Sequence, residues 1–572
     1  MKYMKQRVKA ILIKPNISIR GAMSVIQQET HKAHDAPGNI ALVVDRKNKL
    51  IGIVTDGDIR RALLKGASID DCVDKIINTN PVTFHKNITT EEILEKTIEI
   101  VKERKTANKR LDVIITVDDD NKPYDVFPFF ELWKRGEIKT RVVSIVGLGY
   151  VGLTLGLTLA DLGFKVIGVD SNKEVIKKLK HKKSHVHERG IDALLNMHLN
   201  KNFFVQDRFE NNDSDVYVIC VGTPVDARGK VKIESLKNSL HYITNILKKD
   251  DLIILRSTIP IGSCRDIVIP FVEKKTKMKA GEDFHIAFAP ERTIEGDALN
   301  ELRTLPQVIG GYDKKSAELT VKLFKHLTDS IVLVDNIEDA EMIKLINNSY
   351  RDFTFSFANE IALMCEKFNL DSHKVISGAN HGYERSLVPK PSPGVGGYCL
   401  TKDPFILIDS AKKKGYKAKL PLLARNINDK MIDYVCKKVD TFAKKNKKTK
   451  SKMKIFAIGL AFKGSPETSD TRESTSLMIL NKLKKKYKNI VVYDPVVKKS
   501  DIKKLNLTYN TLNQGFKNAD CVLVLNNHKS YKDLDVYKLL STMNKSGMFF
   551  DAWHLFDKTA IEQVNNTDYQ SI

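Results

Sequence analysis

No two cysteines of this 572-residue sequence have the CxxC spacing of a zinc site or a redox pair. The seven cysteines are scattered along the chain: Cys72, Cys220, Cys264, Cys365, Cys399, Cys436 and Cys521. An odd number without a framework argues against a disulfide-stapled domain and favours a reducing compartment. We therefore predict a cytoplasmic protein with no metal site, in which a thiol is available for catalysis.

Long uncharged hydrophobic runs are almost absent. Residues 1–16 are basic, but they lack the apolar core and the small-residue cleavage site of a signal peptide. Residues 142–164 are long enough to be read as a membrane span, yet they contain Gly147, Gly149, Gly152 and Gly156, and Asp161 interrupts their end. We expect a buried strand followed by a buried helix here, and no membrane span.

Acidic residues are outnumbered, and the formal net charge is +24. Such an excess can attract a polyanion. The lysines lie in solvated runs such as residues 412–414 and 444–454, without interleaved aromatic residues or a nucleic-acid-binding motif. We predict no nucleic-acid partner, because an anionic cofactor and an anionic substrate would use only a few of these charges.

The length exceeds what one hydrophobic core usually organises, so several domains are expected. Residues 1–138 contain two copies of a strand–turn–strand–helix unit, the first with ALVVD and LIGIVTDGD as its strands. Residues 139–325 and 439–572 alternate strands and helices, whereas residues 326–438 have helical periodicity. We predict an α/β protein with two Rossmann-like doubly wound domains, joined by a central helical domain and preceded by a small α+β module.

A dinucleotide-binding turn is predicted at Gly147, Gly149 and Gly152, between a β-branched strand and a helix. The first glycine makes the tight turn, the second admits the pyrophosphate, and the third lets helix and strand pack closely. Leu148, Tyr150 and Val151 complete the turn, whose amides and helix dipole attract the pyrophosphate. Asp170 ends the second strand and would accept hydrogen bonds from a ribose diol, which favours NAD over NADP.

Cys399 is the predicted nucleophile, because its glycine-rich loop, GVGGYC, lets backbone approach a substrate closely. Lys402 is near enough in sequence to lower the pKa of a thiol. Lys344 and Asn348 are four residues apart on a predicted helix and could together stabilise an oxyanion. Glu291, in a predicted loop, could act as a general base toward water.

Several segments together resemble the UDP-glucose/GDP-mannose dehydrogenase family, in its order and spacing, from about residue 141 to the C-terminus. They are CVGTPVD (220–226), RSTIPIG (256–262), FAPERTIEG (288–296), AEMIKLINNSY (340–350), PSPGVGGYCLTKDP (391–404) and GLAFKGSPETSDTRES (459–474).

The resemblance implies a four-electron oxidation of a nucleotide sugar at C6, from alcohol to carboxylate, with two NAD per substrate. Lys344, Asp403 or an associated water would assist proton removal from the alcohol. Cys399 would form a thiohemiacetal and then a thioester. Water, activated by Glu291 or held by Thr258, would release the acid, for use in surface polysaccharide precursors.

The resemblance also assigns binding residues. Those near the cofactor would be Thr223, Thr258, Glu295, Lys402 and Arg472. Those that meet the nucleotide sugar would be Glu291, Lys344, Asn348, Arg385, Lys390, Gly394, Gly396, Gly397, Phe462 and Lys463. In the family Arg385 reaches across a dimer, so we expect a homodimer or a higher homo-oligomer.

Two features depart from the family pattern. Trp553 stands where some UDP-glucose enzymes have a substrate-binding arginine. PERTIEG resembles the branch that acts on UDP-N-acetylhexosamines, whereas CLTKDP resembles the UDP-glucose branch. We favour a UDP-N-acetylhexosamine over UDP-glucose, with GDP-mannose third.

The N-terminal module resembles paired CBS domains, whose threonine and aspartate hold an adenine nucleotide. Thr55 and Asp58 fit this pattern, whereas the second copy lacks the Thr-x-x-Asp spacing. Regulation by an adenine nucleotide and a purely structural or oligomerisation function are both open. Two rival functions are a two-electron β-hydroxyacid dehydrogenase, which has no use for Cys399, and a nucleotide-sensing protein with an inactive dehydrogenase part.

Overall fold

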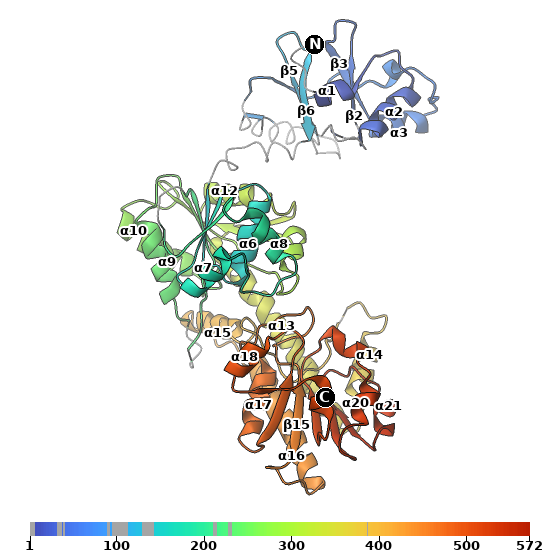
Figure 1. The fold of residues 1–572 in the computed structure, drawn as a ribbon. Coiled ribbons are helices and arrows are strands. Elements are labelled where there is room, and N and C mark those ends of the chain that lie inside the picture. Colours follow the sequence, from blue (N-terminus) through green and yellow to red (C-terminus); the bar gives the residue numbers. More distant parts are fainter. Residues whose placement is uncertain are drawn as a thin grey trace. The chain divides into compact units, whose positions relative to one another are not determined.

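The computed structural model describes residues 6–30, 37, 40–88, 92–93, 96, 113–128, 142–209, 214–226, 231–385 and 387–572. The chain forms two compact units, Met1–Lys139 and Thr140–Ile572 (Figure 1). The sequence pattern ITTEEILEKTIEIVKERK predicts a helix at residues 88–105 in the second copy of the N-terminal repeat, and most of this segment lies outside the described residues.

The N-terminal unit contains two copies of one three-stranded sheet, which confirms the predicted repeat. In each copy the first strand is parallel to the second, and the second is antiparallel to the third. The strands are β1 (Leu12–Ile13), β2 (Ile40–Val44) and β3 (Leu50–Thr55), then β4 (Thr83–His85), β5 (Val113–Val117) and β6 (Pro123–Pro128). The helices are α1 (Gln6–Ala10), α2 (Ile19–Thr30) and α3 (Asp56–Leu64).

The two hairpin turns of this unit use the same chemistry. Asp45 and Asp118 each accept two backbone N–H groups, from the residues two and four positions later. Asn48 (φ 63°) and Asn121 (φ 59°) take the left-handed conformation that asparagine tolerates. The two copies share a core, and the carboxylate of Asp125 on β6 accepts two hydrogen bonds, 2.6 and 2.8 Å long, from the guanidinium of Arg7 on α1.

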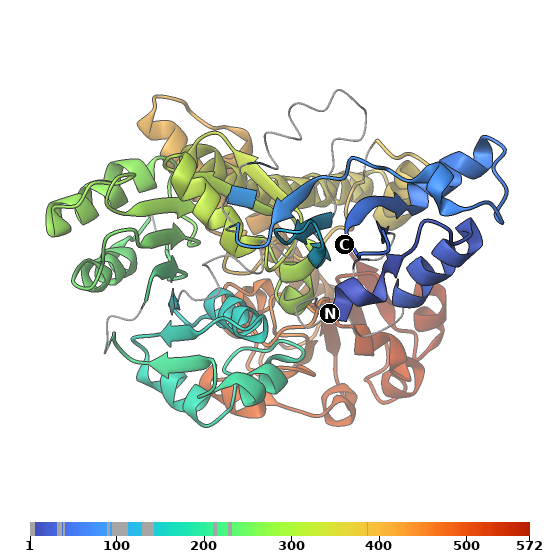
Figure 2. The ribbon, with the colours of Figure 1, turned by 90° about the horizontal axis from the view of Figure 1, so that it is seen from above.

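The second unit begins with an eight-stranded sheet of order β14-β13-β12-β11-β10-β7-β8-β9, in which only the β12–β13 pair is antiparallel. Its strands can be followed from teal to yellow-green in Figure 2. They are β7 (Val143–Val146), β8 (Val166–Val169), β9 (Phe203–Gln206), β10 (Val216–Ile219), β11 (Leu252–Leu255), β12 (His285–Phe288), β13 (Gln307–Gly311) and β14 (Ile331–Val334).

The connecting helices of this sheet are α6 (Tyr150–Asp161), α7 (Lys173–Lys180), α8 (Ile191–His198), α9 (Glu234–Thr244), α10 (Ile269–Thr276), α11 (Ala298–Thr304) and α12 (Lys314–Phe324). Residues 142–164 form β7 and α6, because this apolar segment is buried within the protein. In the described part of the chain, no helix is both long and apolar enough to cross a membrane. The sheet runs past the boundary expected at residue 325, because β14 pairs with β13.

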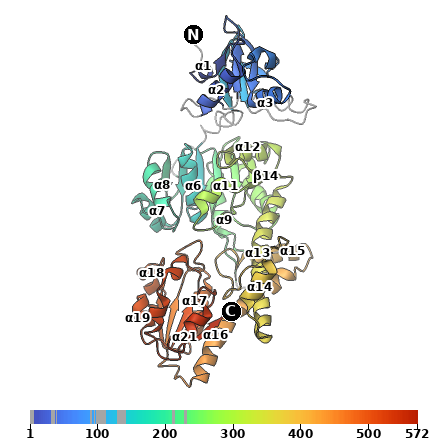
Figure 3. The same cartoon turned by 90° about the vertical axis from the view of Figure 1, so that its right-hand side faces the viewer.

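Long helices connect this sheet to a second one. The 31-residue α13 (Ile337–Lys367) starts at a capping box of Asn336 and Asp339. The others are α14 (Ser372–Asn380), α15 (Asp403–Lys413) and α16 (Leu420–Lys445). α13 packs on α15 and α16, and in Figure 3 it runs down from the first sheet along the second unit. α16 continues past the boundary expected at residue 438.

The C-terminal sheet has six parallel strands in the order β17-β16-β15-β18-β19-β20. They are β15 (Lys454–Ile458), β16 (Asn489–Tyr493), β17 (Thr508–Tyr509), β18 (Cys521–Val524), β19 (Met548–Asp551) and β20 (Asp568–Ser571). The helices are α17 (Thr475–Lys484), α18 (Lys499–Lys504), α19 (Leu512–Phe516), α20 (Val536–Leu540) and α21 (Lys558–Gln563). One face of this sheet shares a hydrophobic core with α16, so the helical segment and the last sheet fold as one body.

Candidate active site

The glycine-rich turn between β7 and α6 has the geometry of a dinucleotide site. Gly147 has φ +92°, and a Cβ at Gly152 would lie 1.9 Å from the Gly147 carbonyl oxygen. A Cβ at Gly149 would meet open space, and no side chain caps α6 at this residue. The Asp170 carboxylate accepts the N–H groups of Leu148 (2.8 Å) and Asn172 (2.8 Å), which fixes it beside the turn. The turn therefore fits a pyrophosphate and the adjoining ribose.

A cavity of about 290 Å³ opens at the carboxyl ends of the parallel strands. It collects segments that are far apart in the sequence: the turn after β7, the loops after β10, β11 and β12, the middle of α13, and the glycine-rich loop before α15. Sixteen of the predicted residues line it: Gly149, Tyr150, Val151, Thr223, Thr258, Glu291, Glu295, Lys344, Asn348, Gly396, Gly397, Cys399, Lys402, Phe462, Lys463 and Arg472.

Cys399 lies in the wall of this cavity and is exposed to it. Protein atoms nevertheless surround the cleft on most sides, so desolvation, with the Asp403 charge, raises the pKa of the thiol although Lys344 and Lys402 lower it. Lys402 lowers the pKa of the thiol as expected, but desolvation outweighs this effect, so the pKa of Cys399 is raised overall. The Lys402 ammonium is paired with Asp403, at Nζ–Oδ1 2.6 Å, so its charge is largely compensated.

Lys344 and Asn348 project from one face of α13 into the cavity, as predicted. Both are buried, and the Lys344 ammonium donates to the backbone carbonyl of Glu291. The Asn348 amide donates to Asp403 Oδ2 (2.5 Å), and the other oxygen of this carboxylate pairs with Lys402. Asp403 is fully buried and does not line the cavity. Asp403 is therefore placed to orient Asn348 and Lys402. Because its carboxylate does not reach the cavity, the predicted direct proton transfer between Asp403 and substrate is not supported.

Both oxygens of the Glu291 carboxylate already accept hydrogen bonds, so Glu291 is poorly placed to act as a general base in this conformation. Arg256 donates from Nε (3.0 Å) and Nη2 (2.7 Å) to one oxygen, and the N–H groups of Arg292 and Thr293 donate to the other. Burial raises the pKa of Glu291, but the Arg256 charge and these hydrogen bonds lower it overall. A carboxylate held in this way is a weak base, because its basic lone pairs are engaged.

The predicted cofactor residues Thr223, Thr258, Glu295 and Arg472, and Lys463 from the predicted sugar site, also line the cavity. The Thr223 hydroxyl donates to the Thr258 carbonyl oxygen (2.5 Å) and thereby ties together the loops after β10 and β11. Desolvation, together with the Asp470 charge, raises the pKa of Glu295 to about 6. Arg472 lies 3.8 Å from Glu295. Desolvation lowers the pKa of Lys463 to about 8.

Some predicted residues lie outside the cavity. Arg385 and Lys390 are exposed on the segment before the cysteine loop, and Gly394, the first glycine of that loop, is buried and does not line the cavity. Trp553 packs at the edge of the C-terminal core and donates from its indole to the Leu525 carbonyl (3.0 Å). It does not line the cavity.

The cavity also contains residues that sequence reasoning missed. Arg351 lines it from α13, seven residues after Lys344 and so on the same helical face. That spacing could have identified it. Tyr398 lies under two cations, with the Lys402 ammonium 5.3 Å and the Arg472 guanidinium 5.1 Å from its ring centre. Arg256 could not have been assigned as the partner of Glu291, because only tertiary packing brings them together.

In the N-terminal unit, Thr55 and Asp58 form a capping box at the start of α3. Thr55 Oγ1 accepts the Asp58 N–H (3.2 Å), and Asp58 Oδ2 accepts the Thr55 N–H (2.9 Å). Arg61 pairs with Asp58 at 2.6 Å. Both side chains therefore stabilise the start of α3, and this role does not depend on a bound nucleotide.

The Rossmann turn, the paired α/β sheets and the cavity with Cys399, Lys344 and Asn348 define an NAD-dependent dehydrogenase. Three domains of one family match in order: the NAD-binding domain at residues 141–328, the central domain at 338–430 and the UDP-binding domain at 456–558. A CBS domain matches residues 3–65. The chain belongs to the UDP-glucose/GDP-mannose dehydrogenase family, and is thus an NAD-dependent nucleotide-sugar dehydrogenase.

Individual relatives agree with this assignment. The chain is 32% identical over 406 residues to a UDP-N-acetyl-D-mannosamine dehydrogenase of Methanococcus maripaludis, which covers 70% of this chain and 89% of that protein. Identity to the enzyme of that name from Campylobacter jejuni is 32% over 410 residues, 70% of this chain and 98% of that one. The structure of the UDP-D-ManNAc dehydrogenase of Pyrococcus horikoshii superposes with a TM-score of 0.69 at 30% identity, over 75% of this chain and 99% of that chain.

Proposed function

We propose that the protein oxidises a UDP-N-acetylhexosamine, with UDP-N-acetyl-D-mannosamine first, at C6 from alcohol to carboxylate. The observation that carries the proposal is the single cavity in which Cys399, Lys344 and Asn348 meet the dinucleotide turn. The names of the relatives and the PERTIEG segment favour this sugar class over UDP-glucose. A part in surface polysaccharide precursor synthesis and a location in the cytoplasm stay predictions.

NAD, held at the Gly147–Gly152 turn and Asp170, would accept the hydride in each of the two oxidations. Lys344 and Asn348 place an ammonium and an amide where the C6 oxygen would carry negative charge. The Cys399 thiolate attacks the aldehyde to give a thiohemiacetal, whose oxidation gives a thioester. Because the pKa of Cys399 is raised, the thiol must lose its proton to solvent as substrate binds. Lys344 is the cation that most lowers the pKa of this thiol, and we assign it to stabilising the thiolate.

Hydrolysis of the thioester requires a positioned water. Glu291 is a poor base while Arg256 holds its carboxylate. We therefore assign Glu291 mainly to orienting the water. Its backbone carbonyl also orients the Lys344 ammonium, from which it accepts a hydrogen bond. Thr258, in the same wall of the cavity, supplies a hydroxyl for the same water.

We infer that the protein is at least a homodimer. One side of α13 keeps a row of exposed apolar residues at helical spacing: Ile346, Tyr350, Phe353, Phe357 and Met364. A continuous apolar face of this kind is costly in water, and a second copy would cover it. Arg385 is exposed and outside the cavity of its own chain, in keeping with a reach into a partner. Sedimentation velocity should give a dimer that Phe357→Lys dissociates, whereas Tyr537→Lys, an exposed tyrosine on α20, should leave it intact.

We keep regulation by an adenine nucleotide at Thr55 and Asp58 as a hypothesis, with a structural module as its alternative. Calorimetry of the full chain with AMP and ATP tests it. Asp58→Asn preserves the size of the side chain at the helix start while it removes the charge, and it should abolish any binding. The absence of heat with the unmodified protein would leave the structural role.

The reaction is tested with a panel of UDP- and GDP-sugars, assayed for NADH formation and for acid. Two NADH per sugar and preference for a UDP-N-acetylhexosamine support the proposal. One NADH per sugar would contradict the four-electron oxidation, and no NADH with any UDP-N-acetylhexosamine would contradict the proposed substrate class.

A further inference from the structure

The loop that carries Cys399 rests on a buried polar network that lies outside the cavity. Four side chains form it: Asp352 and Asn359 on α13, and Arg425 and Asn428 on α16. Asp352, Asn359 and Asn428 are fully buried, and Arg425 is 3% exposed. Polar side chains without water around them hold their partners in fixed geometry, because each lost hydrogen bond leaves an unsatisfied buried group.

One branch of the network holds the start of the loop. Asn359 Oδ1 accepts the Ser392 N–H (2.8 Å), and the Asn359 amide donates to Asn428 Oδ1 (2.9 Å). The Ser392 hydroxyl donates to the Gly394 carbonyl (3.0 Å). The first residues of the loop are thus fixed to α13 and α16 together.

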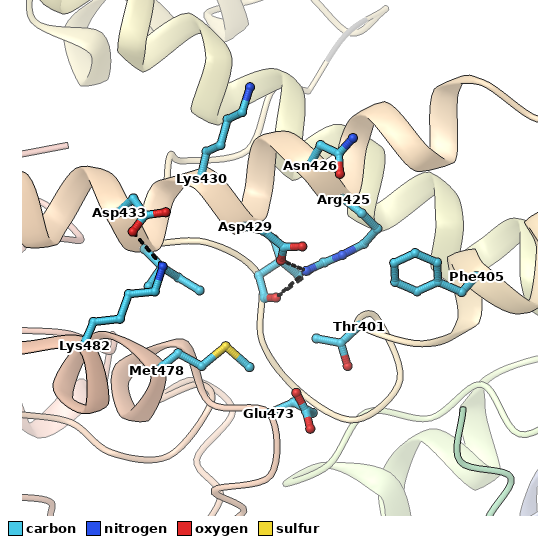
Figure 4. A pocket seen from close by; sticks show the side chains of 12 residues that line it. Thr401, Phe405, Arg425, Asn426, Asp429, Lys430, Asp433, Glu473, Met478 and Lys482 are labelled. Carbon is cyan, nitrogen blue, oxygen red and sulfur yellow. Dashed lines mark hydrogen bonds and ion pairs between the residues drawn. The ribbon is translucent and has the colours of Figure 1, made fainter. Parts of the chain in front are cut away.

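The other branch reaches the middle of the loop through an ion pair. Asp352 Oδ1 accepts from Arg425 Nη1 (2.7 Å) and from the Asn428 amide (2.8 Å). The Arg425 guanidinium also lies 3.4 Å from the Val395 carbonyl oxygen, four residues before Cys399. Its remaining edge faces Asp429, in the groove drawn in Figure 4.

The cysteine loop packs tightly against neighbouring backbone at two of its glycines. Gly394 has φ +91°, and a Cβ there would lie 2.7 Å from the Asn428 carbonyl oxygen. A Cβ at Gly396 would lie 2.6 Å from the Glu473 carbonyl oxygen. A shift of the network is therefore transmitted to the loop, because neighbouring backbone is in close contact with two of its glycines.

The network is not arranged for maximum stability. Arg425 Nε and Asp352 Oδ2 are buried without a hydrogen-bond partner in the described part of the chain. A buried ion pair with unsatisfied atoms is a weak source of stability compared with apolar packing. Its placement points to another role, since Asp352 follows Asn348 by one turn on α13 and Lys344 by two.

We propose that Asp352, Arg425 and Asn428 are positioning residues that set the place of the Cys399 thiol relative to Lys344 and Asn348. α13 then carries both Lys344 and Asn348, which stabilise the oxyanion, and Asp352, which through Arg425 fixes the position of the loop that bears the nucleophile. This inference rests on the proposed function of Cys399. It predicts a defect in the step that captures the aldehyde, while binding of sugar and cofactor is retained.

The test uses the full-length protein with Asp352→Asn, which preserves shape and removes the charge. A displaced thiol should lower kcat on the order of 10- to 100-fold, with the KM values for NAD and for the nucleotide sugar changed less than threefold. Aldehyde should escape before capture, so the NADH yield per sugar falls from two toward one, and a hydrazine probe traps the aldehyde. A merely structural role would not release aldehyde.

Arg425→Lys is the second variant, because it keeps the charge but cannot reach both Asp352 and the Val395 carbonyl; the same leak of aldehyde is expected. Asp433→Asn is the matched control: it lies on α16 in the same groove and pairs with Lys482, away from the loop. Folded Asp352→Asn and Arg425→Lys proteins with unchanged kcat and two NADH per sugar would overturn the inference. If the unmodified protein itself yields only one NADH per sugar, the proposed four-electron oxidation is wrong. That result is distinct from a failure of the positioning role, in which the unmodified protein and both variants yield two.

Discussion

Glu341 lies on α13, three residues before Lys344, and is fully buried. Its carboxylate accepts the N–H groups of Gly262 (2.5 Å) and Cys264 (2.9 Å), and so joins α13 to the loop that follows β11. Desolvation raises the pKa of Glu341 from 4.5 to about 7. Replacement by glutamine should therefore change how stability depends on pH.

The sign follows from linkage. A pKa raised by folding contributes stability that is fully present below the unfolded value of 4.5 and is lost as pH rises through about 7. At about 1.4 kcal/mol per pKa unit, the loss is at most about 3.5 kcal/mol. Glutamine does not titrate, but its amide meets one of the two N–H donors, at a constant cost of about 1–3 kcal/mol. Glu341→Gln should thus be clearly less stable than the unmodified protein at pH 5, and similar or more stable at pH 8.5.

The assay is guanidinium chloride unfolding at pH 5, 6, 7, 8 and 8.5, followed by a probe of the second unit, since a chain with two units need not unfold in one step. Glu338→Gln is the control. Glu338 lies on the same helix and pairs with Arg265 at 2.6 Å, and this hydrogen bond lowers its pKa. Its contribution should be constant from pH 5 to 8.5. If the difference in free energy of unfolding between Glu341→Gln and the unmodified protein is also independent of pH, the reasoning is refuted.

Three further outcomes are expected. Cys399→Ser should reduce acid formation by at least about 1,000-fold, since a serine hydroxyl without an adjacent base is a poor nucleophile; an unchanged rate of acid formation would disprove covalent catalysis. Because the pKa of Lys463 is lowered to about 8 by burial, kcat/KM for the nucleotide sugar should fall above pH 8, and Lys463→Arg should move that limb to higher pH; a limb that stays in place excludes Lys463 as its origin. Arg351→Met should raise the KM for the sugar about 10-fold, as a lost charged hydrogen bond would, with the KM for NAD unchanged; an equal effect on both would place Arg351 outside the sugar site.

Much of the fold could be predicted because its determinants are local. The β-branched residues Val143, Ile145 and Val146 before Gly147 favour the strand β7, and an acidic residue after the next strand completes the pattern. The three-residue and four-residue spacings of α13 place Lys344 and Asn348 on one face, whatever packs against them. The hairpin turns of the N-terminal unit repeat an Asp and an Asn at the same offsets, and this chemistry needs no tertiary contact.

The errors concern pairing between segments that are far apart in the sequence. Lys402 is three residues from Cys399, yet its charge goes to Asp403. Glu291 was predicted to act on water, but its carboxylate is held by Arg256, 35 residues earlier. Sequence spacing does not reveal which of several nearby cations a carboxylate meets, because the answer depends on how strands and helices pack.

The sequence by itself determined the dinucleotide turn, the candidate nucleophile, the face of α13 that carries Lys344 and Asn348, and the family of the protein, since each follows from residues close together or from ordered motifs. Only the tertiary structure decided the ionisation of Cys399, the partner of Glu291 and the link from Asp352 through Arg425 to the cysteine loop. The physical reason is that burial and charge pairing are properties of the packed interior, where segments a hundred residues apart set one another's environment.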